Sequence, residues 1–265
     1  MKKHALPLAA LAGGLIALAL RALQNKTGFE PETGLPIPGT PAAAALVLVL
    51  IALALIFLFL IRKLPKEEDP GPAFPEAFAT DNSLLLAVTV AGLFLMAAAG
   101  ALDIWSGLAA MDLEAGLLVI VSPKARILMG GLVLVSALSL LPAAAACRRR
   151  EESRPFDGRI LLAAPVCMVV RLVLAYRVYS VDPVLANYGV SLLAMVFLTL
   201  AFYRLSSFAF QAGRTRRFAF YAAAAAALCT ASLGDGGNLA GTLHFLGGGL
   251  TALGFLLLRT DAEEA

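Results

Sequence analysis

The sequence feature that most constrains the fold is residues 42–61, a run of twenty apolar residues without a charge. A helix rises about 1.5 Å per residue, so about 20 apolar residues cross the roughly 30 Å hydrocarbon core of a bilayer. Lipid offers the backbone no hydrogen-bond partner, which favours a helix for such a segment. The whole chain is 60% hydrophobic and 15% charged, against about 25% charged residues in soluble domains. The sequence therefore predicts an integral membrane protein.

Seven further apolar runs have a similar length. The expected membrane helices cover approximately residues 5–23, 41–61, 83–102, 126–146, 159–179, 188–207, 217–233 and 240–258. We predict an all-α fold, a polytopic bundle of about eight transmembrane helices that forms one domain over residues 1–265. The first run also fits a signal peptide, because Lys2 and Lys3 precede it and Ala17-Leu18-Ala19 resembles a cleavage site. The sequence leaves open whether this helix is retained.

The loop charges predict the orientation of the bundle. If the N-terminus is cytoplasmic, fifteen of the 21 Lys and Arg residues fall in cytoplasmic segments and five in outer ones. Cytoplasmic loops carry an excess of Lys and Arg in membrane proteins. We therefore expect an N-in/C-in protein of the plasma or inner membrane, with both termini cytoplasmic. The same explanation makes nucleic acid an unexpected partner, because the basic residues lie between apolar runs.

The connection over residues 103–125 differs from the other loops because it contains many apolar side chains, including Trp105. Tryptophan is enriched at membrane–water interfaces. We expect this segment to lie in the outer interface or to re-enter the membrane. The remaining loops are short and polar, and none is long enough to fold as a separate domain.

Arg171 is the most informative polar residue, because it falls past the middle of the fifth expected helix. An arginine at that depth costs about 2.5–3.5 kcal/mol on insertion scales unless it snorkels or finds a partner. Ala163, Cys167 and Ala175 share its helix face, and faces of small residues let helices approach closely. We expect Arg171 to point into the bundle, although it could instead snorkel outward.

Three acidic residues are candidate partners for Arg171 at the outer face: Asp103, Asp182 and Asp235. Each has a simpler explanation, since Asp103 and Asp235 could be solvated helix ends and Asp182 could cap the helix that follows Pro183. Arg177, Tyr179 and Tyr188 fall on the same side of the membrane. The convergence of these groups predicts an outward-facing polar pocket.

His244 is expected one turn inside the last helix, on a face with Gly241, Gly248 and Thr251. This face is opposite a stripe of leucines, so the imidazole should point into the bundle, where it could titrate near neutral pH. It could equally be a hydrogen-bonded packing residue.

No strong catalytic or cofactor motif stands in the sequence. The three cysteines have no metal-ligand spacing, so we expect neither a metal nor a cofactor. Residues 232–239, SLGDGGNL, in a chain of eight predicted helices are slightly similar to the lysoplasmalogenase family of membrane enzymes. The similarity covers only these few residues in a different part of the chain, and the companion Lys-Pro motif near the second helix is missing, so we assign no family.

The sequence favours binding, and translocation, of a small polar, anionic or amphipathic ligand through an outward-facing polar pocket. The ligand-binding residues would be Arg171, Asp103, Asp182, Asp235, His244, Arg177, Tyr179 and Tyr188. Besides the bilayer, the expected partners are a small molecule or lipid and another membrane protein. One alternative is a non-catalytic subunit or assembly factor of a membrane complex. The other is an intramembrane lipid-modifying hydrolase, which would need two acids, or an acid and His244, within hydrogen-bond reach.

Overall fold

The computed structural model describes residues 4–30, 32–33, 35–64, 71–111, 122–148, 157–180 and 188–262. In this part of the chain the fold is all helical, and eight helices are long and apolar enough to cross a membrane. The long helices are α1 (Ala5–Thr27), α2 (Pro41–Ile61), α4 (Ser83–Met111), α5 (Pro123–Ala146), α6 (Ala163–Tyr179), α7 (Gly189–Ser207), α8 (Thr215–Ser232) and α9 (Leu239–Ala262). The short ones are α3 (Phe74–Ala77), η1 (Gly158–Leu162), η3 (Phe208–Phe210) and η4 (Leu233–Asp235).

The third membrane helix is longer than the sequence predicts. α4 continues to Met111, so Asp103 lies two turns before its end and not at a solvated helix terminus. Residues 104–111 contain no proline, and Asp103 has a cationic neighbour within the bundle, so nothing ends the helix there. Residues 103–111 of the predicted interfacial segment therefore continue α4, and its residues 112–121 lie outside the described part of the chain.

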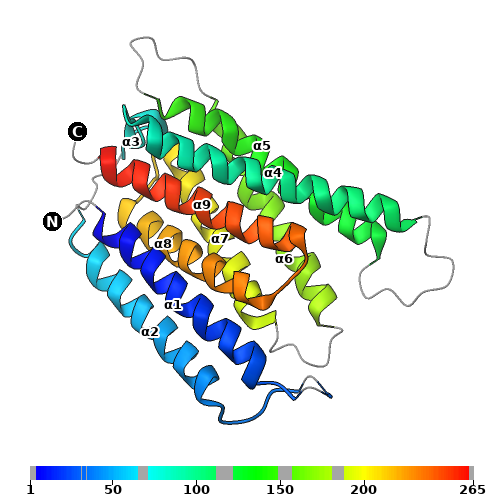
Figure 1. Ribbon diagram of the computed structural model, residues 1–265. Coiled ribbons are helices and arrows are strands. Elements are labelled where there is room, and N and C mark those ends of the chain that lie inside the picture. The colour runs from blue at the N-terminus through cyan, green and yellow to red at the C-terminus, as the bar shows by residue number, and fades with distance from the viewer. Residues whose placement is uncertain are drawn as a thin grey trace.

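Six helices form a ring. Each of α4, α5, α6, α7 and α8 packs against the next helix in the chain, and contacts between α9 and α4 close the ring. α1 packs on the outside of α8, and α2 packs against α1 (Figure 1). α1 begins and α9 ends at the same end of the bundle (Figure 1). We call this the terminal end and the opposite end the cavity end.

Glycines bring α4 close to both of its neighbours in the ring. A Cβ atom built on Gly100 would lie 2.6 Å from the carbonyl oxygen of Gly130 in α5. A Cβ on Gly92 would lie 2.6 Å from the backbone nitrogen of Thr251 in α9. Small residues allow such backbone contacts between membrane helices, where apolar burial supplies little driving force.

The terminal end of the ring is filled by aromatic side chains. The ring of Phe78 is at its centre, 4.9–6.0 Å between centroids from Phe74, Phe208, Phe218 and Phe255. Arg259 is buried beside this cluster and donates to the Thr215 hydroxyl at 2.7 Å and to the Ala77 carbonyl at 3.2 Å. These contacts join α3, α8 and α9.

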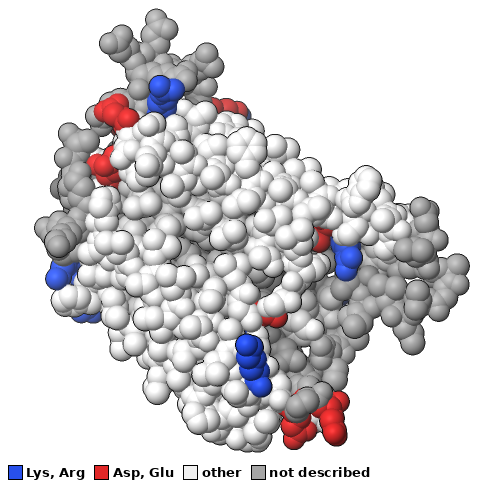
Figure 2. All heavy atoms as spheres, viewed as in Figure 1, with Lys and Arg blue, Asp and Glu red and all other residues white. Residues whose placement is uncertain are grey.

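The outer surface of the bundle is apolar. Only 17% of the apolar stretch of α2 is buried within the protein. Large side chains such as Leu48 and Phe59 are exposed. Figure 2 shows a broad uncharged face, with the charged side chains toward the two ends of the helices. Such a surface is suited to lipid, because exposed apolar patches of this extent are rare on soluble monomers. The prediction of a multi-pass membrane bundle is confirmed at this level.

Candidate ligand-binding site

A cavity of about 600 Å³ lies inside the ring at the cavity end. α1 and all six helices of the ring contribute to its wall, together with η4. Its polar lining residues are Asn25, Asp103, Arg126, Arg171, Tyr179, Tyr188, Ser191, Ser232, Asp235, Asn238 and Thr242. Its larger apolar lining residues are Phe29, Met129, Val178 and Phe245. The cavity is the size of small-molecule sites and combines apolar walls with convergent polar groups, as such sites do.

Arg171 lies in the wall of this cavity, as the small residues on its helix face predict. The residue is 8% exposed, and its Nη1 is 4.0 Å from Oδ2 of Asp103. This separation exceeds the 2.7–3.2 Å typical of a hydrogen bond, so the two groups form a loose ion pair. The Nε atom of Arg171 is buried and has no hydrogen-bond partner among the described residues. Buried polar atoms are almost always satisfied, by protein, water or ligand.

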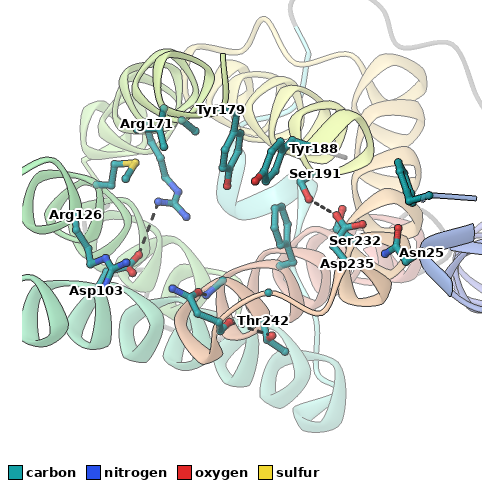
Figure 3. Close-up of a pocket in the computed structure, with 18 residues that line it drawn as sticks. Asn25, Asp103, Arg126, Arg171, Tyr179, Tyr188, Ser191, Ser232, Asp235 and Thr242 are labelled. Carbon is teal, nitrogen blue, oxygen red and sulfur yellow. Dashed lines mark hydrogen bonds and ion pairs between the residues drawn. The ribbon is translucent and has the colours of Figure 1, made fainter. Parts of the chain in front are cut away.

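Asp103 and Arg126 lie on the same side of the cavity as Arg171 (Figure 3). Close packing of α4 on α5 accounts for this, because a Cβ on Gly130 would be 2.8 Å from Cβ of Asp103. Arg126 is one helical turn before Gly130 and lines the same cavity. One carboxylate, Asp103, therefore lies between two guanidinium groups.

The opposite side of the cavity holds Asp235, whose carboxylate is already bound. Arg21 of α1 donates to one oxygen, and the Ser191 hydroxyl donates to the other. Arg21 is only 2% exposed and also donates to Gln24 at 2.8 Å. Asn25 donates to the Gly234 carbonyl at 2.8 Å. These bonds fix η4 against α1 and hold Asp235 in the cavity wall.

Two tyrosines line the cavity between the side that holds Arg171 and the side that holds Asp235. The rings of Tyr179 at the end of α6 and Tyr188 before α7 are stacked, with centroids 4.2 Å apart and planes 4° apart. Both line the cavity, and the charges of Arg171, Asp103 and Asp235 all act on Tyr179. Figure 3 shows both rings directed into the cavity.

The structure places two other predicted site residues, His244 and Arg177, outside the lining of the cavity. His244 is fully buried, and neither of its ring nitrogens has a hydrogen-bond partner among the described residues. It does not line the cavity, although Thr242 and Phe245 of the same helix do. Arg177 is exposed and does not line it either. Asp182 lies outside the described residues.

Two important residues are absent from the sequence-based site, Arg21 and Arg126. Both stand at the outer ends of expected helices, 5–23 and 126–146, where they count as outer charges, whereas α1 and α5 extend past them. Arg21 carries the same sequence signal as Arg171, an arginine that shares its helix face with small residues. Gly13 and Ala17 stand eight and four residues before it, on the same helix face.

The arrangement is suited to binding a ligand by hydrogen bonds, charge and aromatic contact. Among the described residues, no group of three or more His, Cys, Asp and Glu side chains is placed to hold a metal ion. Comparisons with protein-family models, curated proteins and solved structures gave no match to this chain.

Proposed function

We propose that this protein binds, and carries across the membrane, a small polar, anionic or amphipathic ligand, with Arg171 as its main ligand-binding group. One observation carries the proposal. Arg171 is buried in the wall of a cavity of about 600 Å³, and its Nε has no partner among the described residues. A buried guanidinium N–H without a hydrogen bond is costly, and an anionic ligand bound beside Arg171 would offset part of that cost.

The orientation is also a proposal. The excess of Lys and Arg in alternate loops favours a cytoplasmic terminal end, so the cavity end would face outward. Two of the outer cations, Arg21 and Arg126, lie in helices around the cavity, which explains their presence on that side without a topological role. Reporter fusions after residue 262 and within the 28–40 loop would test this orientation.

The binding proposal is tested by a compound screen on the purified full-length protein in neutral detergent. The readout is ligand-dependent thermal stabilisation, since a ligand that binds only the folded state raises the apparent Tm. The library contains anions, cations, zwitterions and neutral amphipaths. Arg177→Ala is the matched control, because Arg177 is on the same helix but outside the cavity.

We expect compounds that stabilise the wild type and Arg171→Ala differently. Loss of a hydrogen bond to a charged group costs about 1.5–3 kcal/mol, or roughly a tenfold to 150-fold weaker affinity. Arg171→Lys keeps the charge but loses the planar fork of donors, so we expect an intermediate loss. Equal stabilisation of the wild type, Arg171→Ala and Arg177→Ala by every hit would refute the proposal.

One observation favours a second candidate, a lipid-modifying hydrolase. Asp103 and Asp235 line the same cavity from opposite sides (Figure 3), so a substrate held between them can meet a general acid on one side and a general base on the other. His244 has no acidic partner among the described residues, so the candidate depends on the two aspartates. An assay of lysophospholipid hydrolysis should show a loss of about 10²-fold or more in Asp103→Asn and Asp235→Asn. Asp157→Asn, an exposed control outside the cavity, should leave the rate unchanged.

A further inference from the structure

The charges around the cavity do not cancel. Of the described residues that line it, four are charged: Asp103, Arg126, Arg171 and Asp235. Arg21 lies behind Asp235 and pairs with it. The five side chains together carry three positive and two negative charges, so the described residues around the cavity have one positive charge in excess.

The excess positive charge lies on one side of the cavity. Asp235 is neutralised by Arg21 and accepts a further hydrogen bond from Ser191. The remaining polar lining near it, including Asn25, is uncharged. On the other side, Arg126 and Arg171 share Asp103, and both act on it electrostatically. Figure 3 shows this separation, with Arg126, Asp103 and Arg171 together and Asn25, Ser191 and Asp235 across from them.

The three residues on the charged side do not use all the hydrogen-bond donors of Arg171. Arg171 is 4.0 Å from Asp103, and its Nε has no partner among the described residues. An anion beside Arg171 would accept from guanidinium donors that Asp103 does not use. Arginine is suited to this, because its fork of N–H groups matches carboxylate and phosphate oxygens.

We propose that the cavity takes an organic ligand with one net negative charge, a carboxylate or a phosphodiester, whose anionic group binds beside Arg171 on the side of the cavity that holds Arg126 and Asp103. The rest of the ligand extends past Met129 and Phe245 toward uncharged hydrogen-bonding groups at Asn25 and Asn238. This inference rests on the proposed ligand-binding function and specifies the charge of the ligand. It also assigns a specificity role to Arg126, which balances the charge of Asp103 and so leaves that of Arg171 in excess.

The charge of the cavity can be measured without knowing the ligand. Met129→Cys places a thiol in the cavity wall one turn from Arg126, and Thr242→Cys places one away from the arginine side (Figure 3). Each variant is reacted with anionic sulfonatoethyl methanethiosulfonate and cationic trimethylammonioethyl methanethiosulfonate. The rate of the parent protein, which keeps its three native cysteines, is subtracted. For each variant, the rate constant of the anionic reagent is divided by that of the cationic reagent. This ratio is then divided by the same ratio for a free thiol in solution.

We expect the corrected ratio at Met129→Cys to favour the anionic reagent by roughly tenfold. The two reagents carry opposite charges, so the same positive potential raises the rate of one and lowers the rate of the other. The preference should be smaller at Thr242→Cys. Adding Arg126→Gln or Arg171→Gln should bring the ratio at Met129→Cys close to one, whereas Arg177→Gln should leave it unchanged.

The outcomes separate this inference from the function on which it rests. Faster reaction of the cationic reagent, or a ratio unaffected by Arg126→Gln and Arg171→Gln, overturns the single-anion ligand but leaves a binding cavity. A Met129→Cys thiol that reacts with neither reagent in the folded protein, yet reacts after denaturation, shows that the cavity is closed to small molecules and overturns the proposed function itself.

Discussion

Two adjacent glycines in α5 give a sharp test of how the charged side of the cavity is assembled. A Cβ on Gly130 would lie 2.6 Å from the Gly100 carbonyl oxygen, 2.8 Å from Cβ of Asp103 and 2.9 Å from the Ile104 nitrogen. A Cβ on Gly131 would meet nothing within 4 Å. Gly130→Ala must therefore push α4 and α5 apart, and Gly131→Ala is its matched control.

The magnitude follows from these distances. The contact at Gly130 must open from 2.6 Å to the 3.4 Å at which ordinary contact begins, and backbone atoms cannot rotate away as a side chain can. Overpacking of this kind costs about 1–3 kcal/mol. The gain in helix propensity from Gly to Ala, up to about 1 kcal/mol, is common to both variants and cancels in their difference. Gly130→Ala should thus be less stable than Gly131→Ala by about 1–3 kcal/mol.

The assay is thermal unfolding in neutral detergent, followed by circular dichroism at the helical minimum. At roughly 2–4 °C per kcal/mol for a chain of this size, the two apparent Tm values should differ by about 2–12 °C. Equal Tm values for the two variants would refute the close contact of α4 with α5, and with it the placement of Asp103 beside Arg126.

Two other predictions concern single interactions. Arg21→Ala should destabilise the protein by about 3–5 kcal/mol, because it leaves the Asp235 carboxylate without its cation. A double-mutant cycle with Asp235→Ala should show strong coupling between the two residues. Additive effects of the two substitutions on stability would contradict the ion pair. Burial raises the pKa of the Cys147 thiol, which also donates to the Ala143 carbonyl. In Cys167→Ser/Cys229→Ser protein, this thiol should therefore stay protonated and unreactive toward N-ethylmaleimide at pH values approaching 9.0, the normal thiol pKa, and react only after denaturation. Rapid labelling of folded protein would show that it is accessible.

The sequence was sufficient to predict the membrane helices, because lipid imposes a length and a composition that can be counted. It also identified Arg171, since an arginine deep in an apolar run is costly in lipid and the small residues on its helix face give it a route into the bundle. Asp103, Asp235, Tyr179 and Tyr188 were grouped because the predicted topology places them at one end of the helices, and all four line the cavity.

What the sequence did not predict depends on helix ends and on packing between helices. Arg21 and Arg126 resemble loop charges in the sequence because polar residues shorten a hydropathy-based helix, whereas α1 and α5 continue past them. The rotation of α9 against α4 places His244 outside the cavity wall. That rotation follows from the glycine contacts of Gly92 and Gly247, which no periodicity within one helix reveals.

We propose Arg171 as the residue that holds the ligand. The most direct test of this role is the equilibrium dissociation constant of the best-stabilising compound, measured by titration on wild-type, Arg171→Ala and Arg177→Ala protein. We expect at least about tenfold weaker binding to Arg171→Ala, from the loss of one charge-assisted hydrogen bond, and unchanged binding to Arg177→Ala. Equal dissociation constants for all three proteins would contradict it.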